Sequence, residues 1–265
     1  MIFLLLRALV EGVIGRFAVR PERARVVGSF PNPIRVPAFV PASRGAAFQT
    51  VFANAVAPRV DYDEREGVGG AVVDWVHVRG GTPPRGVVIV FHGLGGSSAS
   101  PGVRRVAREA ARRGFAVAVF NRRGHAPGVA MLGEFPDHAC DADTASVVER
   151  VALRYSPHRV FAVGLSAGAN ALVRYLATES PMIAAAVSVC NPLDLNSCYD
   201  RLKLRPRLDA MLASWAMGVY SRHRARFRAR SMMDFDEFVT GRPLGEYYGD
   251  QGSAAALRAT GVPTL

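Results

Sequence analysis

A serine with a glycine two positions away on each side stands in the pentapeptide GLSAG, residues 164–168. An apolar run at residues 159–163 precedes it, and a segment with helical spacing, about 167–178, follows it. Small residues at the two glycine positions permit a tight strand-to-helix turn that lifts a serine hydroxyl clear of the sheet. The pattern predicts that Ser166 is a nucleophile; a plain glycine–serine turn is the alternative.

A serine that attacks a carbonyl group needs hydrogen-bond donors for the oxyanion that forms, commonly two backbone N–H groups. We expect one from Ala167, directly after the nucleophile and at the start of a helix. The glycine-rich segment FHGLGGSS, residues 91–98, follows an apolar strand and is expected to supply the other, from Leu94. His92 in this segment is predicted to shape the loop by hydrogen bonding rather than to act as a base.

Candidates for the acid and the base are few. His125, at the end of the next strand, is expected to be structural or at the surface, with substrate contact as the alternative. His223 is the one histidine that follows Ser166 in the sequence, and no core strand is expected to position it. Asp194 is the candidate acid, with a structural Asn-Pro-x-Asp turn as the alternative. The remaining histidines are predicted to be structural: His77, His138 and His158.

The elements that would position these residues alternate along the chain. Strands are predicted at residues 71–78, 86–91, 115–120, 159–163 and 182–189, and helices at 103–113, 143–155 and 167–178. Strands that are apolar throughout are typical of a parallel sheet covered by helices on both faces. The fold class is therefore α/β with a mostly parallel sheet.

We divide the chain into four parts. Residues 1–68 are a lead-in rich in proline and glycine, residues 69–195 the α/β core, and residues 196–250 a mostly helical lid inserted between two core strands. Residues 251–265 are expected to start the returning core strand.

The first 20 residues are apolar but interrupted by Arg7, Glu11 and Arg16, so they fall short of the ~18–20 uncharged residues that a membrane span needs. A basic leading region and a cleavage site, which mark a secretory signal, are missing. An interfacial helix over residues 1–20 is possible, and a helix packed on the protein's own surface is the alternative. We expect a cytoplasmic or peripherally membrane-associated protein that is not secreted.

The chain carries a net charge of +11, which raises the question of nucleic-acid binding. Its basic residues are scattered, so we expect no nucleic-acid partner; a membrane surface is a possible partner, and a solvated basic surface is the alternative. The 3 cysteines form no CxxC pair, which favours a reducing compartment and indicates no metal site.

Together these motifs resemble the α/β-hydrolase superfamily, and more closely its AB-hydrolase family 4 branch. The resemblance covers residues 48–265 and is carried in order by FQT (48–50), HGLGGS (92–97), NRRG (121–124), GLSAGAN (164–170), CNPLDL (190–195), Phe235-Asp236 and Tyr247-Tyr248. It implies an α/β-hydrolase fold and a serine hydrolase of carboxylic esters that works without a cofactor through an acyl-enzyme on Ser166. The implied substrate is an apolar ester, such as an acylglycerol, under the lid; an alcohol O-acyltransferase is an alternative.

One departure from the family pattern concerns the acid and the base. In the family, the segment PTL opens the strand that ends in the catalytic aspartate, and a histidine follows later. Here PTL is residues 263–265, where the sequence stops. The resemblance therefore implies that the C-terminal strands, the acid and the base are missing from this sequence. An inactive fragment or pseudoenzyme of poor solubility is the alternative to the serine hydrolase.

Overall fold

A computed structural model of the protein describes residues 57–130, 134–220 and 228–264. The expected interfacial helix at residues 1–20, the FQT element and His223 lie outside the described residues. Among the helices that are described, none is both long and apolar enough to cross a membrane.

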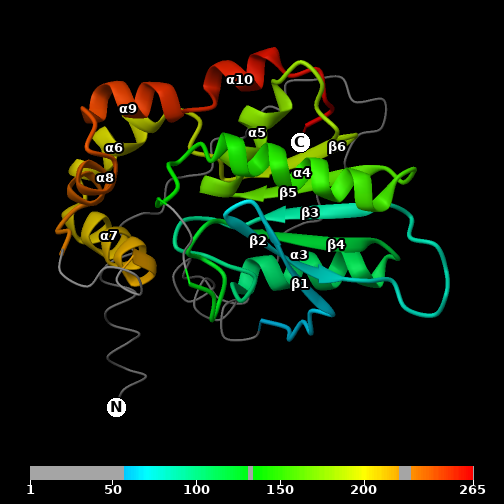
Figure 1. The fold of residues 1–265 in the computed structure, drawn as a ribbon. Coiled ribbons are helices and arrows are strands. Elements are labelled where there is room, and N and C mark those ends of the chain that lie inside the picture. Colours follow the sequence, from blue (N-terminus) through cyan, green and yellow to red (C-terminus); the bar gives the residue numbers. More distant parts are fainter. Residues whose placement is uncertain (1–56, 131–133, 221–227, 265) are drawn as a thin grey trace, which may run out of the picture. The chain divides into compact units, whose positions relative to one another are not determined.

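One mixed sheet of six strands runs through the described part of the chain, in the order β1-β2-β4-β3-β5-β6 (Figure 1). The four strands β4, β3, β5 and β6 are parallel, and β1 and β2 add an antiparallel edge. The bounds are Glu64–Val68 for β1, Ala71–Val76 for β2, Val87–Phe91 for β3, Ala116–Asn121 for β4, Val160–Leu165 for β5 and Ala185–Val189 for β6. The predicted mostly parallel α/β sheet is confirmed.

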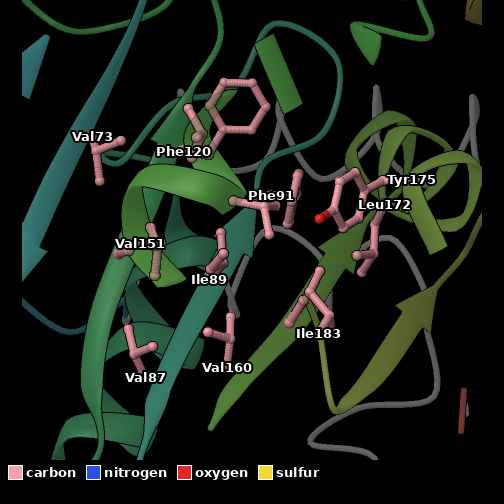
Figure 2. Close-up of a cluster of buried hydrophobic side chains, with 14 of the residues drawn as sticks. Val73, Val87, Ile89, Phe91, Phe120, Val151, Val160, Leu172, Tyr175 and Ile183 are labelled. Carbon is pink, nitrogen blue, oxygen red and sulfur yellow. The ribbon is translucent and has the colours of Figure 1, made fainter. Parts of the chain in front are cut away.

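Helices cover both faces of this sheet, as strands buried on both sides require. Helix α3, Pro101–Arg112, packs on one face against Val88 and Val90. Helices α4, Asp141–Tyr155, and α5, Ala167–Leu176, pack on the opposite face against Ile89 and its neighbours. Figure 2 shows the core on this second face, where side chains of β3 and β5 meet those of the two helices. Each fully buried valine, isoleucine or phenylalanine there stabilises the fold by about 1.5–3 kcal/mol.

The sheet begins earlier in the chain, and its last strand begins later, than the apolar pattern predicts. The sheet begins at β1, inside the lead-in expected to end at residue 68, because Gly69 with φ 61° turns the chain into a hairpin with β2. β1 alternates between exposed and half-buried residues at the sheet edge, so it lacks the apolar pattern that revealed the other strands. The last predicted strand begins at Ala185 rather than at Met182.

Four helices, α6 to α9, gather beyond one end of the sheet and are called the cap helices below (Figure 1). They are α6 Leu195–Lys203, α7 Pro206–Tyr220, α8 Met232–Thr240 and α9 Leu244–Gln251. They share an apolar cluster of their own, which includes Tyr199, Met232 and Phe235.

The chain after the cap helices returns to the sheet later than expected. Helix α10, Ala254–Ala259, contacts α5, and its alanine-rich sequence AAALRA favours a helix over a strand. A strand-like contact forms only at Thr264, which bridges Ala186 of β6 in parallel, while the Ala186 N–H donates to the Pro263 carbonyl at 2.9 Å.

Candidate active site

Ser166 stands alone between β5 and α5, at a sharp turn of the backbone. Its φ of 53° and ψ of −119° are a conformation that residues with a Cβ rarely adopt. Its N–H donates to the Val189 carbonyl at 2.8 Å, which ties the turn to the neighbouring strand β6. The residue itself is exposed, so the turn presents the hydroxyl to an incoming molecule.

The two glycines of the pentapeptide allow this turn because the backbone packs too closely for a side chain. A Cβ on Gly164 would lie 2.5 Å from the Cα of Ala169, and one on Gly168 would lie 2.4 Å from the carbonyl oxygen of His92. Real Cβ atoms do not approach backbone this closely, so each position requires glycine. The close approach at Gly168 also brings α5 against the loop that follows β3.

That loop passes beside Ser166, and a buried histidine holds it in shape. His92 Nε2 accepts the Arg122 N–H at 3.2 Å, so the neutral ring carries its proton on Nδ1 and donates it to the Gly93 carbonyl at 2.8 Å. Burial, together with His125 and Arg122 nearby, holds the pKa of His92 well below its ordinary value. The predicted role of His92 in shaping the loop is confirmed.

The same hydrogen bonds orient the next peptide unit. The Gly93 carbonyl accepts both from His92 and from the Gly96 N–H, the latter at 3.0 Å. In a trans peptide the N–H points opposite to the carbonyl, so the Leu94 N–H projects away from the loop interior. Gly93 lies beside the serine, since a Cβ built on it would be 3.2 Å from Ser166 Cβ. Leu94 therefore directly follows the residue that makes this contact, and its role as an oxyanion donor stays a prediction.

Ala167, the other predicted donor, is the first residue of α5. The first N–H groups of a helix have no intrahelical acceptor, and they favour negative charge at that end. The buried side chain of Arg122 stabilises the turn, because its Nη2 donates to the Ala167 carbonyl at 2.9 Å. Arg122 belongs to the NRRG motif at the end of β4, and nothing in the sequence indicates this contact with Ala167.

The loop is also covered from the cap side by α7. A Cβ built on Gly95 would lie 3.1 Å from the carbonyl oxygen of Trp215. The Trp215 side chain itself points outward and is 57% exposed. A cap helix therefore rests directly on the loop that carries Leu94.

Asp194, the candidate acid, lies at the start of α6 and caps it. Its Oδ1 accepts the Ser197 N–H at 3.1 Å and its Oδ2 accepts the Ser197 hydroxyl at 2.6 Å. These hydrogen bonds hold the pKa of Asp194 below its ordinary value. Within the described residues it contacts no histidine, and helix capping accounts for the aspartate at this position.

The other described histidines lie in four settings. The His158 N–H donates to the Tyr155 carbonyl at 2.7 Å, just after α4. The His125 ring is tilted against the His92 ring, with 4.9 Å between their centroids, and its Nδ1 contacts the Arg123 carbonyl at 2.8 Å. His77 contacts Tyr155 and Glu64 at the far side of the core. His138, which precedes α4, contacts Asp236 of α8 through Nε2 at 3.2 Å.

Ser166 opens into a cavity of about 210 Å³ between the core and the cap helices. Leu94 and Ala167 line it beside the serine, so the structure brings the three predicted residues together. Most of the other wall is apolar, from Pro192, Leu195, Leu202, Leu212 and Met232. His138 and Tyr199 also line it and were not predicted to do so, although the Phe235-Asp236 and Tyr247-Tyr248 pairs that surround His138 were among the quoted motifs.

The sequence profile of the alpha/beta hydrolase fold family matches residues 86–237, more than half of the chain. The protein belongs to this family. Its fold is likewise similar to the esterase Pf2001 of Pyrococcus furiosus, with a TM-score of 0.54 and 17% identity over 78% of this chain and 74% of that one. The finer assignment to the AB-hydrolase family 4 branch stays a prediction.

Two curated relatives each match more than half of the chain. The embryogenesis-associated protein EMB8 of Picea glauca is 31% identical over 197 residues, 65% of this chain and 43% of that protein. The medium-chain fatty acid ethyl ester synthase/esterase 2 of Saccharomyces cerevisiae is 32% identical over 153 residues, 55% of this chain and 31% of that protein. The matched part thus spans less than half the length of either relative.

Proposed function

We propose that this alpha/beta hydrolase cleaves carboxylic esters with Ser166 as its nucleophile. The observation that carries the proposal is an exposed serine at a strained strand-to-helix turn, on the wall of an apolar cavity and beside Leu94 and Ala167. The esterase and ester-synthase activity in the name of the yeast relative supports the same reaction class.

The proposed chemistry follows from these positions. The Ser166 oxygen attacks the ester carbonyl while its proton leaves to a general base. The Leu94 and Ala167 N–H groups hold the negative oxygen of the tetrahedral intermediate. The intermediate expels the alcohol, which takes up a proton, and leaves an acyl group on the serine. Water then hydrolyses the acyl-enzyme and releases the carboxylic acid. An alcohol in place of water would form a new ester; this acyltransferase alternative is supported by the words ester synthase in the name of the yeast relative.

The substrate proposed is an ester with a short or medium acyl chain. The cavity of about 210 Å³ is smaller than the ~300–1,000 Å³ pockets that enclose drug-sized ligands. Its apolar wall suits an acyl chain, and the cap helices would form the lid over it. A membrane surface as the source of the substrate stays a prediction.

A fluorophosphonate probe tests whether Ser166 is an activated nucleophile. Within the described residues no imidazole is hydrogen-bonded to Ser166 Oγ, so labelling separates an enzyme from a catalytically silent scaffold. We expect labelling of Ser166 and hydrolysis of p-nitrophenyl butyrate, both lost in Ser166→Ala and both kept in Ser180→Ala, which changes an exposed serine outside the cavity. Adding ethanol and measuring ethyl ester separates acyl transfer from hydrolysis. No labelling and no turnover by the unmodified protein would overturn the proposal in favour of the scaffold.

A further inference from the structure

An open groove, called the arginine groove below, lies at the end of the sheet away from Ser166. It has a volume of about 750 Å³, and its wall is formed by the chain before β1, the end of β2 with the loop that follows it, and α3. Arg85 and Gly114, which stand shortly before β3 and β4, belong to this wall, whereas Ser166 directly follows β5. Because β3, β4 and β5 are parallel, the groove and Ser166 lie at opposite ends of the sheet (Figure 1).

Five arginines from separate parts of the chain meet in this wall. They are Arg59, Arg79, Arg85, Arg108 and Arg112, and all five residues are exposed. Asp61 is the acidic residue of the same wall. The basic residues look scattered in the sequence, but the fold gathers these five around one hollow and gives it a strongly positive potential.

Three of these arginines lack a partner for their charge. Arg59, Arg108 and Arg112 make no ion pair within the described residues. Arg79 pairs with Asp63 at 3.3 Å, but its side chain is 80% exposed, and exposed ion pairs of this kind are weak. The guanidinium groups of the groove are therefore available to a ligand.

Two of the unpaired arginines repel each other on α3. Arg108 and Arg112 are four residues apart on this helix, so their Cβ atoms lie about 5–6 Å from each other, and like charges at this spacing destabilise a helix. Glu109, the acidic residue of α3, pairs with Arg113 instead. An anion in the groove would relieve a repulsion that the described part of the protein leaves in place.

Part of the wall between the arginines is apolar. Val60, Val76 and Ala111 line the groove, and the same side chains pack against the buried core on the α3 face of the sheet. An inorganic anion would leave this apolar surface in contact with water, whereas an organic body would cover it. A planar body suits the groove in particular, because guanidinium groups stack on planar rings.

We propose that the arginine groove binds an organic phosphate: a molecule that joins two or more phosphate groups to an apolar or planar body, as a nucleoside diphosphate or triphosphate does. Guanidinium groups bind phosphate oxygens through paired parallel N–H donors, and two linked phosphates can engage Arg108 and Arg112 together. The groove, at about 750 Å³, falls within the ~300–1,000 Å³ typical of small-molecule pockets. A flat membrane surface would meet the rim and leave the apolar wall uncovered. The proposed site goes beyond ester hydrolysis and shares no residue with the Ser166 cavity.

Calorimetry on the unmodified protein tests the class of ligand. ADP, ATP, pyrophosphate and adenosine are titrated at low ionic strength and without divalent cations, because salt screens exposed charges. We expect ADP and ATP to bind, and pyrophosphate and adenosine to bind at least about tenfold more weakly than ADP, because each lacks one half of the ligand. Either fragment binding as tightly as ADP would overturn the proposal, as would the absence of binding by ADP and ATP.

The Arg108→Gln substitution assigns the binding to the groove. It removes one unpaired guanidinium and keeps a polar side chain, so we expect ADP to bind about tenfold more weakly. Arg258→Gln, which removes an exposed arginine of α10 outside the groove, is the charge-matched control and should keep the affinity within about twofold. Arg59→Gln provides a second variant, on a different part of the wall, if Arg108→Gln melts early. Equal losses in the groove variant and the control would show that net charge alone attracts the ligand, which would overturn the proposal.

Sedimentation with vesicles of phosphatidylcholine and phosphatidylserine tests a membrane surface as the occupant of the groove. We expect no sedimentation that depends on Arg108. Sedimentation that Arg108→Gln abolishes and that ADP does not displace would assign the groove to a membrane and overturn the proposal.

The Ser166→Ala variant separates this inference from the proposed ester hydrolysis. Because the groove and Ser166 lie at opposite ends of the sheet, we expect this variant to bind ADP as tightly as the unmodified protein does. A loss of ADP binding in Ser166→Ala would place the ligand in the Ser166 cavity and overturn the proposal. Failure of ester hydrolysis leaves the inference standing, because every readout here is binding.

Discussion

The backbone of Ser166 is strained, and glycine at this position should release the strain. A residue with a Cβ held at φ 53° and ψ −119° stores about 1–3 kcal/mol of conformational energy. Glycine adopts the same conformation without a Cβ clash, but it loses about 0.5–1 kcal/mol through the greater entropy of its unfolded chain. The Ser166→Gly variant should therefore be more stable by about 1 kcal/mol at mid-range, and by at most about 2.5 kcal/mol.

Thermal unfolding by circular dichroism measures this difference. For a protein of this size, 1 kcal/mol shifts Tm by about 2–4 °C, so we expect a rise of about 2–4 °C. Ser166→Ala is the matched control, because it removes the hydroxyl and keeps the Cβ that causes the strain. The Ser166 hydroxyl makes no hydrogen bond within the described residues, so the alanine variant should melt within about 0.5 kcal/mol of the unmodified protein.

The comparison of the two variants decides the outcome. If the glycine variant melts at or below the temperature of the alanine variant, the turn is not strained and the reasoning fails. If the Tm of both variants rises equally, the hydroxyl rather than the backbone is the source of the instability. A rise confined to glycine would show that stability is given up at the nucleophile position.

Further substitutions test three other parts of the structure. Gly168→Ala places a Cβ 2.4 Å from a backbone oxygen and should lower Tm strongly, whereas Gly218→Ala in α7 meets nothing within 4 Å and should raise stability by about 0.5–1 kcal/mol. Arg154 lowers the pKa of Glu64 from 4.5 to about 2. The stabilisation of the folded state by this ion pair is therefore complete above pH 4.5 and lost as pH falls toward 2. Over that pH window the urea midpoint should fall less in Arg154→Met than in the unmodified protein. Asp194→Ala should lower Tm and Asp194→Asn should lower it much less, because asparagine also caps a helix; equal losses in both variants would contradict the capping role.

The central strands could be predicted because their apolar runs reflect burial on both faces. Val87, Ile89 and Phe91 pack against α4 and α5 while Val88 and Val90 pack against α3, and continuous hydrophobicity reports that situation directly. The edge strand β1 has no such pattern, because half of it faces solvent and its pairing depends on a neighbour that local sequence does not specify.

The nucleophile turn could be predicted equally well, since Ser166 and its two glycines lie within five consecutive residues. The contact between His138 and Asp236 could not be predicted. His138 lies in a loop and Asp236 in a cap helix, and the two are 98 residues apart in the chain. A polar residue in a loop gives no signal of the partner that buries it. Arg122 is a similar case, since its acceptor at Ala167 lies 45 residues away.

The contact between α7 and the loop at Gly95 has a spectroscopic consequence. The chain has 2 tryptophans, and they occupy opposite environments: Trp75 is fully buried in the sheet and Trp215 stands exposed on the helix that rests on the loop. Acrylamide quenches fluorescence from an exposed indole and leaves a buried one nearly untouched. Quenching of the unmodified protein therefore reports on the cap helices alone, so ligand-induced movement of α7 can be followed without an attached dye.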